Sequence, residues 1–388
     1  MNVLDVGIAL GVISLFFIVY PHIVYPWVLR VCRRFFSKPF SEDISYTPFV
    51  DILIAAHNEE DGIATCINSI LSSNYPPEKI RVFVGDDGST DATASVVETI
   101  ISTDSRVKIL LRARGGKNAA LDLLIPLVDA SIVVFMDADT IIEKDALRHL
   151  VAPFHDESVG ATISVRDPST VKTQAIKEIG DLGYRENDSR VNQYESDLHS
   201  TVTSYGAFYA VRSELISSLN NSKVADDFVM ILRAMRAKKR VVVANQAIAN
   251  EMRHNSIRVE VNRKVRTVSG GIAALWMERT LLLPKYGWVA FFLWSHKVVR
   301  WYSAFFLITF FFATWLTLAN PLVFGLMFYG QFAFYSLALL SIAANRMGQN
   351  VPILSTIEYF VKMNIALLKA WVVFFRVKHT DVWMPGSS

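Results

Sequence analysis

Apolar and charged residues divide this chain into a polar middle and two apolar ends. The stretch from Val6 to Leu29 is almost unbroken apolar sequence, long enough to cross the ~30 Å hydrocarbon core of a bilayer. It lacks the short apolar core and small-residue cleavage site of a signal peptide, so we expect it to remain as an anchor. Charges recur every few residues from about Asp51 to about Arg266, as in a water-soluble domain. We therefore predict three parts: an anchor over 1–38, a soluble domain over 39–280 and a membrane-associated part over 281–388.

Basic residues follow the anchor directly, at Arg30, Arg33, Arg34 and Lys38. By the positive-inside rule they hold that end of the helix in the cytoplasm. The soluble domain is then cytoplasmic, and we expect a multi-pass protein of the cell membrane.

The C-terminal part contains two more predicted spans, at 303–319 and 321–344. A turn at Asn320 and Pro321 would make them an antiparallel pair that returns the chain to the cytoplasm. The preceding stretch, 282–301, interleaves aromatic and basic residues and is predicted to be an interfacial helix.

The last apolar stretch, Ile353 to Phe375, is long enough to span but carries a polar stripe of Glu358, Lys362 and Lys369. Such a stripe is typical of a helix lying in the membrane interface, which is the interpretation we favour. The alternative is a third C-terminal span that packs through its polar face.

Within the soluble domain, apolar strands alternate with segments of helical periodicity. This alternation predicts an α/β fold with a mostly parallel sheet between helices. Polar clusters follow three of the strands, at His57-Asn58-Glu59, at Asp86-Asp87 and at Asp137-Ala138-Asp139. Because ligands bind beyond the carboxyl ends of such strands, we expect the three clusters to meet at one edge.

Composition and motifs exclude several classes of protein. The chain has 388 residues, 52% of them hydrophobic, and its net charge of +3 indicates no nucleic-acid partner. Cys32 and Cys66 lack metal-ligand spacing, so both are interpreted as structural. Neither a P-loop nor a G-x-G-x-x-G motif follows the first strand, which argues against a Walker ATPase and a dinucleotide-binding fold.

Asp137 and Asp139 form an Asp-x-Asp motif at the end of a buried strand. Mn²⁺ or Mg²⁺ is usually held by one or two such carboxylates together with substrate phosphates. The same motif occurs in solvated turns, but its place beside two other polar clusters favours a metal site.

The order of "AAHNEE", "VGDDGSTD", "GGKNAALD" and "MDADT" resembles the family 2 glycosyltransferases, which have a nucleotide-sugar-binding GT-A fold. "GAFYAVRSEL", "VADDFVMILRAMRAKKRVVVANQAIANE" and "NRKVRT" continue the resemblance, which covers about Val50 to Thr267. The chain is most similar to the membrane-anchored branch that contains cellulose, hyaluronan, chitooligosaccharide and poly-N-acetylglucosamine synthases.

The resemblance implies roles for individual residues on the nucleotide side. The first strand and the loop after it meet the nucleotide in the family, which implies contacts from Ala55, His57 and Glu59. Asp87, or Asp86 one position earlier, matches an aspartate that contacts the base.

The resemblance also places residues around the diphosphate. Lys117 would approach the nucleotide, unless it is a solvated loop lysine. Asp139 would be a ligand of the metal ion that bridges the diphosphate, and Asp137 would support it.

In "VADDF", Asp227 occupies the place of the family's acidic catalytic motif and is the candidate general base for inverting single displacement. Acidic residues at this place also suit a helix N-terminus. Polymerising members carry Gln-x-x-Arg-Trp on the next helix, where this chain has 263–267, "RKVRT". Arg263 and Arg266 would still bind diphosphate oxygens, or else rest on anionic lipid headgroups. The missing Trp argues against processive synthesis, and Gly270-Gly271 suggests a mobile lid.

The resulting hypothesis is metal-dependent transfer of a sugar from a nucleotide-sugar donor, expected to be a UDP-sugar, to a saccharide or lipid-linked saccharide acceptor. The reaction would take place at the cytoplasmic membrane face, among membrane lipids, in cell-surface or exopolysaccharide synthesis. A homo-oligomer or a secretion partner would be needed to build a polymer conduit. The alternatives are a processive polysaccharide synthase with a variant acceptor motif and a catalytically silent membrane scaffold of the same fold.

Overall fold

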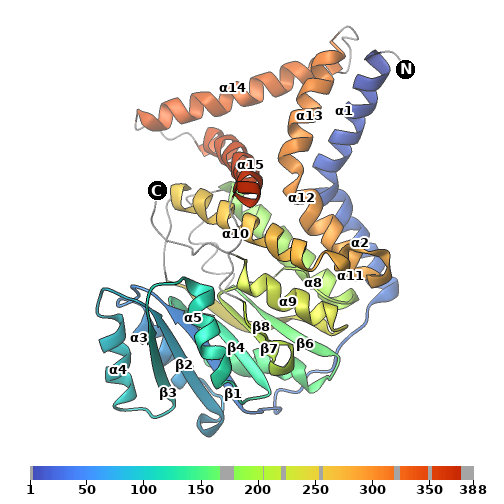
Figure 1. Cartoon of the computed structure of the whole chain (residues 1–388). Coiled ribbons are helices and arrows are strands. Elements are labelled where there is room, and N and C mark those ends of the chain that lie inside the picture. Colours follow the sequence, from blue (N-terminus) through green and yellow to red (C-terminus); the bar gives the residue numbers. More distant parts are fainter. Residues whose placement is uncertain are drawn as a thin grey trace.

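The computed structural model describes residues 3–166, 179–203, 205–219, 224–252, 257–318, 324–347 and 352–376. Strands gather at one end of the molecule, and the apolar helices from both ends of the chain gather at the other (Figure 1). Between them lie the helices that cover the sheet.

Eight strands form a sheet in the order β3-β2-β1-β4-β7-β6-β8-β5. Their bounds are β1 Val50–Ala56, β2 Ile80–Asp87, β3 Val107–Arg112, β4 Ile132–Asp137, β5 Thr140–Ile142, β6 Val159–Val165, β7 Phe208–Arg212 and β8 Arg240–Glu251. Strands β3, β2, β1 and β4 are parallel to one another, whereas β7 is antiparallel to both β4 and β6. The predicted α/β fold with a mostly parallel sheet is confirmed.

Both faces of the sheet are buried, which explains why its central strands are continuous apolar runs. In β1, Ile52 and Ile54 face one core cluster, and Leu53 between them faces the other. Asp51 on the same strand is fully buried, but it accepts two hydrogen bonds from Arg81 and two from backbone N–H groups before β4. A buried carboxylate is tolerated because these donors replace water.

Helices cover the two faces of the sheet: α3 Ile63–Leu71, α4 Thr93–Ile101 and α6 Ala146–Val151 on one, and α5 Lys117–Leu124, α8 Ile179–Leu198 and α9 Asp226–Arg236 on the other. The helix α10, Ile257–Met277, lies beyond α9 and contributes to the same core cluster as α9. Cys66 is buried in α3 and has a free thiol.

The N-terminal helix is longer than predicted. It runs from Val3 to Phe36 as α1 Val3–Val19, a π-helical turn η1 Tyr20–Val24 and α2 Tyr25–Phe36, and is apolar enough to span a membrane. The second half enters the soluble domain, because Tyr25 and Leu29 belong to the same core cluster as α8 and α9.

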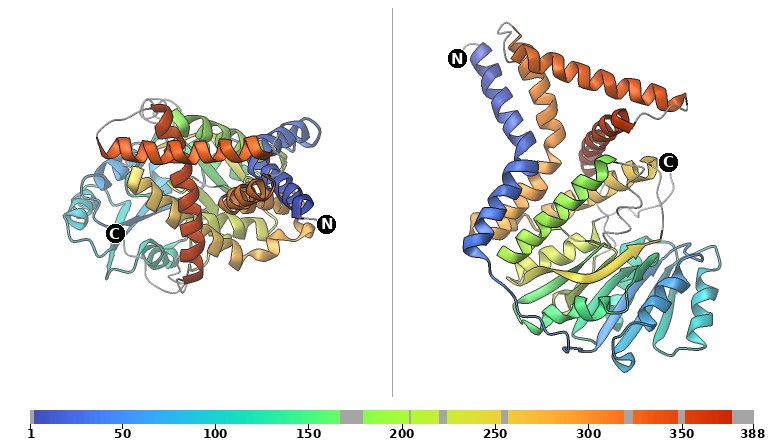
Figure 2. Two further views of the ribbon diagram at one scale, coloured as in Figure 1. Left: turned by 90° about the horizontal axis from the view of Figure 1, so that it is seen from above. Right: turned by 180° about the vertical axis from the view of Figure 1, so that it is seen from behind.

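The C-terminal apolar helices are not arranged as predicted. The helix α13, Ser303–Leu316, lies beside α1, and α14, Leu326–Arg346, leads away from both across the molecule (Figures 1 and 2). Close packing explains the α1–α13 pairing, since a Cβ atom at Gly7 would lie 2.6 Å from Cγ2 of Thr317. The expected antiparallel pairing of α13 with α14 is therefore replaced by pairing with α1, and the predicted turn at Asn320 and Pro321 lies outside the described residues.

By length and composition, residues 326–345 of α14 form a second candidate span. The stretch 288–301, followed by α13, would make a third candidate, with a bend of 59° between its two parts. The predicted interfacial placement of 282–301 stays a prediction.

The last helix, α15 Pro352–Arg376, crosses α14 when seen from above (Figure 2, left) and packs against α10 through Leu367 and Ala370. Its polar stripe begins at Glu358, which is 4% exposed and accepts hydrogen bonds from Ser341 and Asn345 of α14. This part of the stripe therefore faces another helix. Whether α15 spans the bilayer or lies at its surface stays a prediction.

A buried polar network joins the N-terminal helix to the soluble domain and to η8, a π-helical turn over Leu293–Val298. At its centre is Glu195 of α8, which is fully buried. Its Oε1 atom accepts a hydrogen bond from Tyr25 of α2 at 2.7 Å and lies 2.7 Å from Nδ1 of His296. The other ring nitrogen of His296 lies 3.2 Å from Oδ1 of Asp188. The carboxylates of Glu195 and Asp188 thus join α2, α8 and η8, which lie far apart in the sequence.

Replacing Tyr25 with Phe should destabilise the protein by about 1–3 kcal/mol, because a buried carboxylate then loses one donor while the packing is kept. The measurement is thermal unfolding in a mild detergent. Tyr329→Phe, at an exposed position on α14, is the matched control and should leave the melting temperature unchanged. Equal melting temperatures for all three proteins would contradict a stabilising role of the network.

Candidate active site

The carboxyl ends of β1, β2 and β4 meet at one edge of the sheet, because the three strands are parallel and in register. Ala55 of β1 lies opposite Gly85 of β2 and Asp137 of β4, and Ala56 lies opposite Asp86. The predicted convergence of the three polar clusters follows directly from this register.

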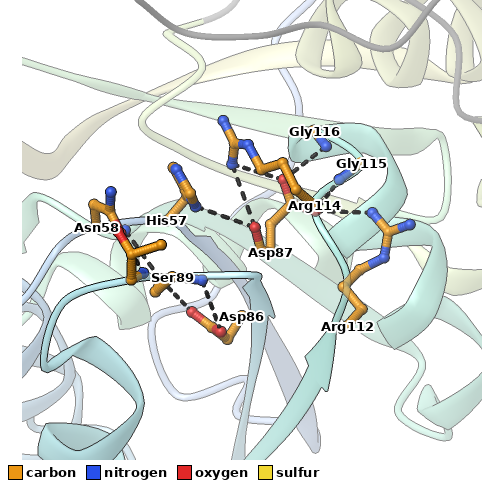
Figure 3. Close-up of polar contacts among 10 residues, drawn as sticks. His57, Asn58, Asp86, Asp87, Ser89, Arg112, Arg114, Gly115 and Gly116 are labelled. Atoms are coloured by element: carbon orange, nitrogen blue, oxygen red, sulfur yellow. Dashed lines mark hydrogen bonds and ion pairs between the residues drawn. The ribbon is translucent and has the colours of Figure 1, made fainter.

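Asp87 is the best-connected carboxylate of this edge (Figure 3). It is 2% exposed, and Oδ1 accepts hydrogen bonds from Arg112 at 2.8 Å and from the N–H of Gly115 at 2.8 Å. Oδ2 accepts from Arg114 at 2.7 Å and from the N–H of Gly116 at 2.6 Å. Gly116 has a φ of 95°, a conformation that favours glycine. Asp87 thus holds the loop after β3 against the end of β2.

Asp86 and the loop after β1 form a second set of contacts (Figure 3). The hydroxyl and the N–H of Ser89 both donate to Asp86, and the N–H of Asn58 donates to the Ser89 hydroxyl at 3.0 Å. The His57 ring nitrogen Nδ1 lies 3.1 Å from the carbonyl oxygen of Asp87. These contacts fix the two loops to each other. The carboxylates of both aspartates are engaged by the protein itself.

Glu59 stands at the start of the loop that leads into α3. Its N–H donates to the hydroxyl of Thr93 at 2.8 Å, at the first residue of α4. The structure therefore brings Ala55, His57, Glu59 and Asp87 to one edge, as the sequence predicted.

Lys117, the first residue of α5, connects two acidic positions. Its ammonium group lies 2.8 Å from Oδ1 of Asp137 and 3.1 Å from Oδ2 of Asp226. Burial alone would lower the pKa of Lys117, but the charges of Asp137 and Asp226 outweigh it and hold this pKa above its usual value. The next residue, Asn118, donates to the carbonyl oxygen of Val224, just before α9. Lys117 is therefore held by two carboxylates at the start of α5 and is not a solvated loop lysine, and its contact with a nucleotide stays a prediction.

The donor set around Asp137 and Asp139 suits a metal ion that arrives with a phosphate ligand. Both side chains are partly exposed, and Cys66 lies beneath them, where burial and then the charge of Asp139 raise the pKa of its thiol. Within the described ranges, no group of three or more His, Cys, Asp or Glu side chains could hold a metal ion alone. One or two carboxylates completed by substrate phosphates are the usual arrangement for Mg²⁺.

Asp226 and Asp227 open helix α9 at the same edge. Asp226 is 7% exposed and accepts a hydrogen bond from the Tyr209 hydroxyl at 3.3 Å. Oδ1 of Asp227 accepts from the N–H of Phe228 at 2.8 Å. Gly206 lies directly against this carboxylate, since a Cβ atom at Gly206 would be 2.7 Å from Oδ2 of Asp227.

The two predicted diphosphate-binding arginines lie on α10 but differ in their surroundings. Arg263 forms a bidentate ion pair with Glu251, at 2.9 and 3.1 Å, and Glu251 also pairs with Arg166. Arg266 lies on the acidic side: desolvation and Arg263 lower the pKa of its guanidinium, and the charges of Asp137 and Asp226 act in the opposite direction. Arg266 is therefore the better placed of the two toward the Lys117 cluster.

The predicted mobile lid at Gly270-Gly271 is wrong. Helix α10 continues through both residues, and the ring of Trp301 packs against Gly271, where a Cβ atom would be 3.1 Å from Cζ2 of Trp301. The glycine thus permits close packing rather than bending.

Sequence reasoning missed Arg112, Arg114 and Glu251, and it left Asp226 without a role. The signal for the two arginines was available, because Arg112 is the last residue of β3 and Arg114 follows it, and the carboxyl end of β3 lies beside that of β2. The pairing of Glu251 with Arg263 joins a strand end to a helix and has no local signal.

Comparison with known proteins agrees with this geometry. Residues 51–219 match the family model for glycosyl transferase family 2. The beta-monoglucosyldiacylglycerol synthase of a Nostoc species is 31% identical over 192 residues, which are 48% of this chain and 41% of that protein. The poly-beta-1,6-N-acetyl-D-glucosamine synthase of Staphylococcus aureus is 28% identical over 166 residues, 41% of this chain and 40% of that protein. The chain thus matches about two fifths of the length of these curated relatives.

A solved structure shares the fold over nearly the whole chain. It is a mannosyltransferase from Pyrobaculum calidifontis in complex with GDP-Man and Mn²⁺. It has a TM-score of 0.71 and 21% identity, and it covers 97% of this chain and 99% of its own. At this identity the likeness concerns the fold alone. The predicted GT-A fold, with apolar helices at both ends, is confirmed.

Replacing Asp87 with Asn should destabilise the protein by roughly 1.5–3 kcal/mol, because two charge-assisted hydrogen bonds from arginines lose their ionised acceptor. Thermal unfolding measures the effect. Asp129→Asn, at a carboxylate whose side chain is 88% exposed, is the control and should change little. An unchanged melting temperature for Asp87→Asn would show that the four contacts do not stabilise the loop.

Proposed function

Residues 51–219 match the family model for glycosyl transferase family 2, and from this match we propose that the protein transfers a sugar from a nucleotide-sugar to a hydroxyl of a lipid or lipid-linked saccharide. The observation that carries the proposal is the Lys117–Asp137–Asp226 cluster at the carboxyl edge of the parallel sheet, with Arg266 of α10 on its acidic side. This cluster combines cationic groups that bind phosphate with carboxylates that bind a divalent cation.

The donor is proposed to lie along the edge formed by β1, β2 and β4. Ala55, His57, Glu59 and Asp87 line the nucleoside end of this edge, and Asp137 and Asp139 line its diphosphate end. Two observations support this direction: His57 is joined to the end of β2, and Lys117 is joined to the end of β4. UDP is the expected nucleotide of the donor.

A divalent ion, Mn²⁺ or Mg²⁺, is proposed at Asp139 with Asp137 beside it. When bound, it would offset the negative charge of the departing diphosphate. Lys117 and Arg266 place two further positive charges near the same oxygens.

Asp227 is proposed to be the general base. It would take the proton of the acceptor hydroxyl while that oxygen forms a bond to the anomeric carbon, and the bond from this carbon to the diphosphate breaks. A positioned base of this kind contributes roughly 10²–10⁴-fold to the rate. The contact with the N–H of Phe228 orients the carboxylate, and Gly206 leaves room for it.

A lipid-linked acceptor is favoured by the position of the site relative to the apolar helices. Helix α10, which carries Arg266, packs against α15, and Trp301 at the end of the 288–301 stretch packs against Gly271 of α10. The cytoplasmic face is proposed for the domain because Arg30, Arg33 and Arg34 lie at the domain end of the N-terminal helix.

A processive synthase is the second candidate. The observation in its favour is Trp301, whose ring lies edge-on to Phe228 at 6.2 Å and so brings an aromatic side chain close to the start of α9. Product length separates the two candidates: a single added sugar supports the first, and long chains support the second.

Nucleoside-diphosphate release tests the proposed reaction. Protein in lipid nanodiscs is incubated with UDP- and GDP-sugars, with Mn²⁺ or Mg²⁺, and with diacylglycerol or lipid-linked saccharide. We expect one donor to be used, release to stop with EDTA, and Asp139→Asn and Asp227→Asn each to reduce it at least 100-fold. Asp129→Asn should retain full activity. Binding of no donor in the presence of metal would refute the proposal and favour the silent scaffold.

The position of Asp227 can be tested without changing its charge. Gly206→Ala would push a methyl group against the carboxylate, so we expect kcat to fall at least ten-fold while the Kd of the nucleotide stays unchanged. Gly330→Ala is the control, because a Cβ atom there meets no other atom within 4 Å. A normal kcat for Gly206→Ala would argue against Asp227 as the base.

A further inference from the structure

Lys297 lies on the membrane-helix side of the start of α9. It belongs to η8, between α11 Trp288–Phe292 and α12 Val299–Trp301, and is partly buried. Its ammonium group lies over the ring of Phe228, 5.3 Å from the ring centre, in a cation–π contact. Phe228 directly follows Asp227, so the ammonium group stands beside the proposed base.

Three carboxylates act on the charge of Lys297 from a distance, those of Asp188, Glu195 and Asp227. Among the residues that the structure describes, no Asp or Glu side chain makes an ion pair with it. The nearest acidic groups of its own region, Asp188 and Glu195, are already bound by His296, and Asp188 is also bound by Arg300. An ammonium group that makes no ion pair is incompletely compensated for its lost water.

Lys117, also beside the start of α9, is a lysine whose charge is balanced by carboxylates. Lys117 lies within 3.1 Å of Asp226 and 2.8 Å of Asp137, so its charge is used within the protein. The start of α9 is therefore flanked by two lysines: Lys117 makes two ion pairs, and Lys297 makes none with the described residues. The helix N-terminus adds partial positive charge between them. An anionic ligand group is consequently favoured on the Lys297 side.

The approach to Lys297 is bordered by side chains that suit a lipid. Trp294 of the same turn is 49% exposed, and Tyr302, which precedes α13 in the chain, is 39% exposed. Large aromatic side chains in such positions are typical of the membrane–water interface. The anionic group is thus expected to belong to a molecule that is held in the bilayer.

We propose that Lys297 binds the phosphate of a lipid acceptor, so that a hydroxyl carried close to that phosphate is presented to Asp227. This inference rests on the proposed function and specifies its acceptor as a hydroxyl-bearing anionic lipid, either a phospholipid headgroup or a saccharide linked to a lipid through phosphate. The phosphate itself does not react. The hydroxyl oxygen forms the new bond to the sugar, its proton passes to Asp227, and the nucleoside diphosphate leaves.

The test compares acceptors in nanodiscs of constant surface charge. Phosphatidylglycerol or a diphosphate-linked saccharide is the anionic acceptor, diacylglycerol is the uncharged one, and phosphatidylserine keeps the total anionic fraction equal. Sugar transfer is measured as kcat/KM for each acceptor. Isothermal titration with the nucleoside diphosphate and Mn²⁺ is carried out in parallel.

Wild-type protein should prefer an anionic acceptor, and Lys297→Gln should lower the anionic-to-neutral ratio of kcat/KM about ten-fold, mainly through KM. Lys297→Arg should keep most of the preference. Lys285→Gln is the matched control: it removes an exposed lysine of the nearby turn η7 Pro284–Tyr286 and should leave the ratio unchanged.

The outcomes distinguish the two proposals. Equal losses for both acceptors, or a wild-type preference for diacylglycerol, would overturn the role of Lys297 while nucleotide binding shows the donor site intact. A failure of wild-type protein to bind nucleotide would instead refute the proposed function. If Lys297→Gln does not fold, retention of the preference in Lys297→Arg and its loss in Lys297→Met decide the question, with folding checked by thermal unfolding. A preference that falls equally in Lys285→Gln would reduce the effect to general surface charge.

The anionic acceptor that the protein uses identifies the source of the phosphate. Transfer to phosphatidylglycerol alone identifies a phospholipid headgroup, and transfer to the diphosphate-linked saccharide alone identifies a lipid-linked sugar. Both results support phosphate recognition by Lys297, provided that the ratio falls in Lys297→Gln.

Discussion

The four residues Gly115, Gly116, Lys117 and Asn118 form the turn on which the rest of the site depends. The N–H groups of both glycines donate to Asp87 at the end of β2. Lys117 pairs with Asp137 at the end of β4, and Asn118 donates to the backbone just before α9. One short segment therefore fixes the distances between the proposed nucleoside region, the proposed diphosphate region and the proposed base. Such positioning matters because a displacement of about 1 Å can cost a hundred-fold in rate.

A second constraint joins this site to the apolar helices. The carboxylates of Glu195 and Asp188 hold α2 and η8 against α8 through Tyr25, His296 and Arg300. Because these partners come from both ends of the chain, the N-terminal helix and the segment before α13 cannot move independently of the domain. The same anchoring sets where Lys297 stands relative to Phe228.

Much of the edge of the sheet could be predicted because its signals are local. An apolar run that ends in "GDD" or "MDAD" marks both a buried strand and the end at which polar groups appear, and parallel register then brings these ends together. Contacts between distant segments could not be predicted in the same way. Asp87 was expected to face the nucleotide base, yet its four hydrogen bonds come from a loop 25 to 29 residues further on. The partner of α13 and the burial of Glu358 likewise depend on how helices pack, which a single apolar pattern does not specify.

The distribution of positive charge suggests how donor and acceptor are kept apart. Asp137 and Asp226 neutralise Lys117, so Lys117 alone would offset little of the charge of a nucleoside diphosphate. Arg266 and a metal ion would supply the further positive charge. Lys297 makes no ion pair with the described residues, although Asp188, Glu195 and Asp227 act on its charge, and it would need no metal ion to attract an anion. An anionic acceptor would therefore bind near Lys297, away from the proposed donor site. Asp227, which acts on the charges of both lysines, would then face both reactants as the proposed base.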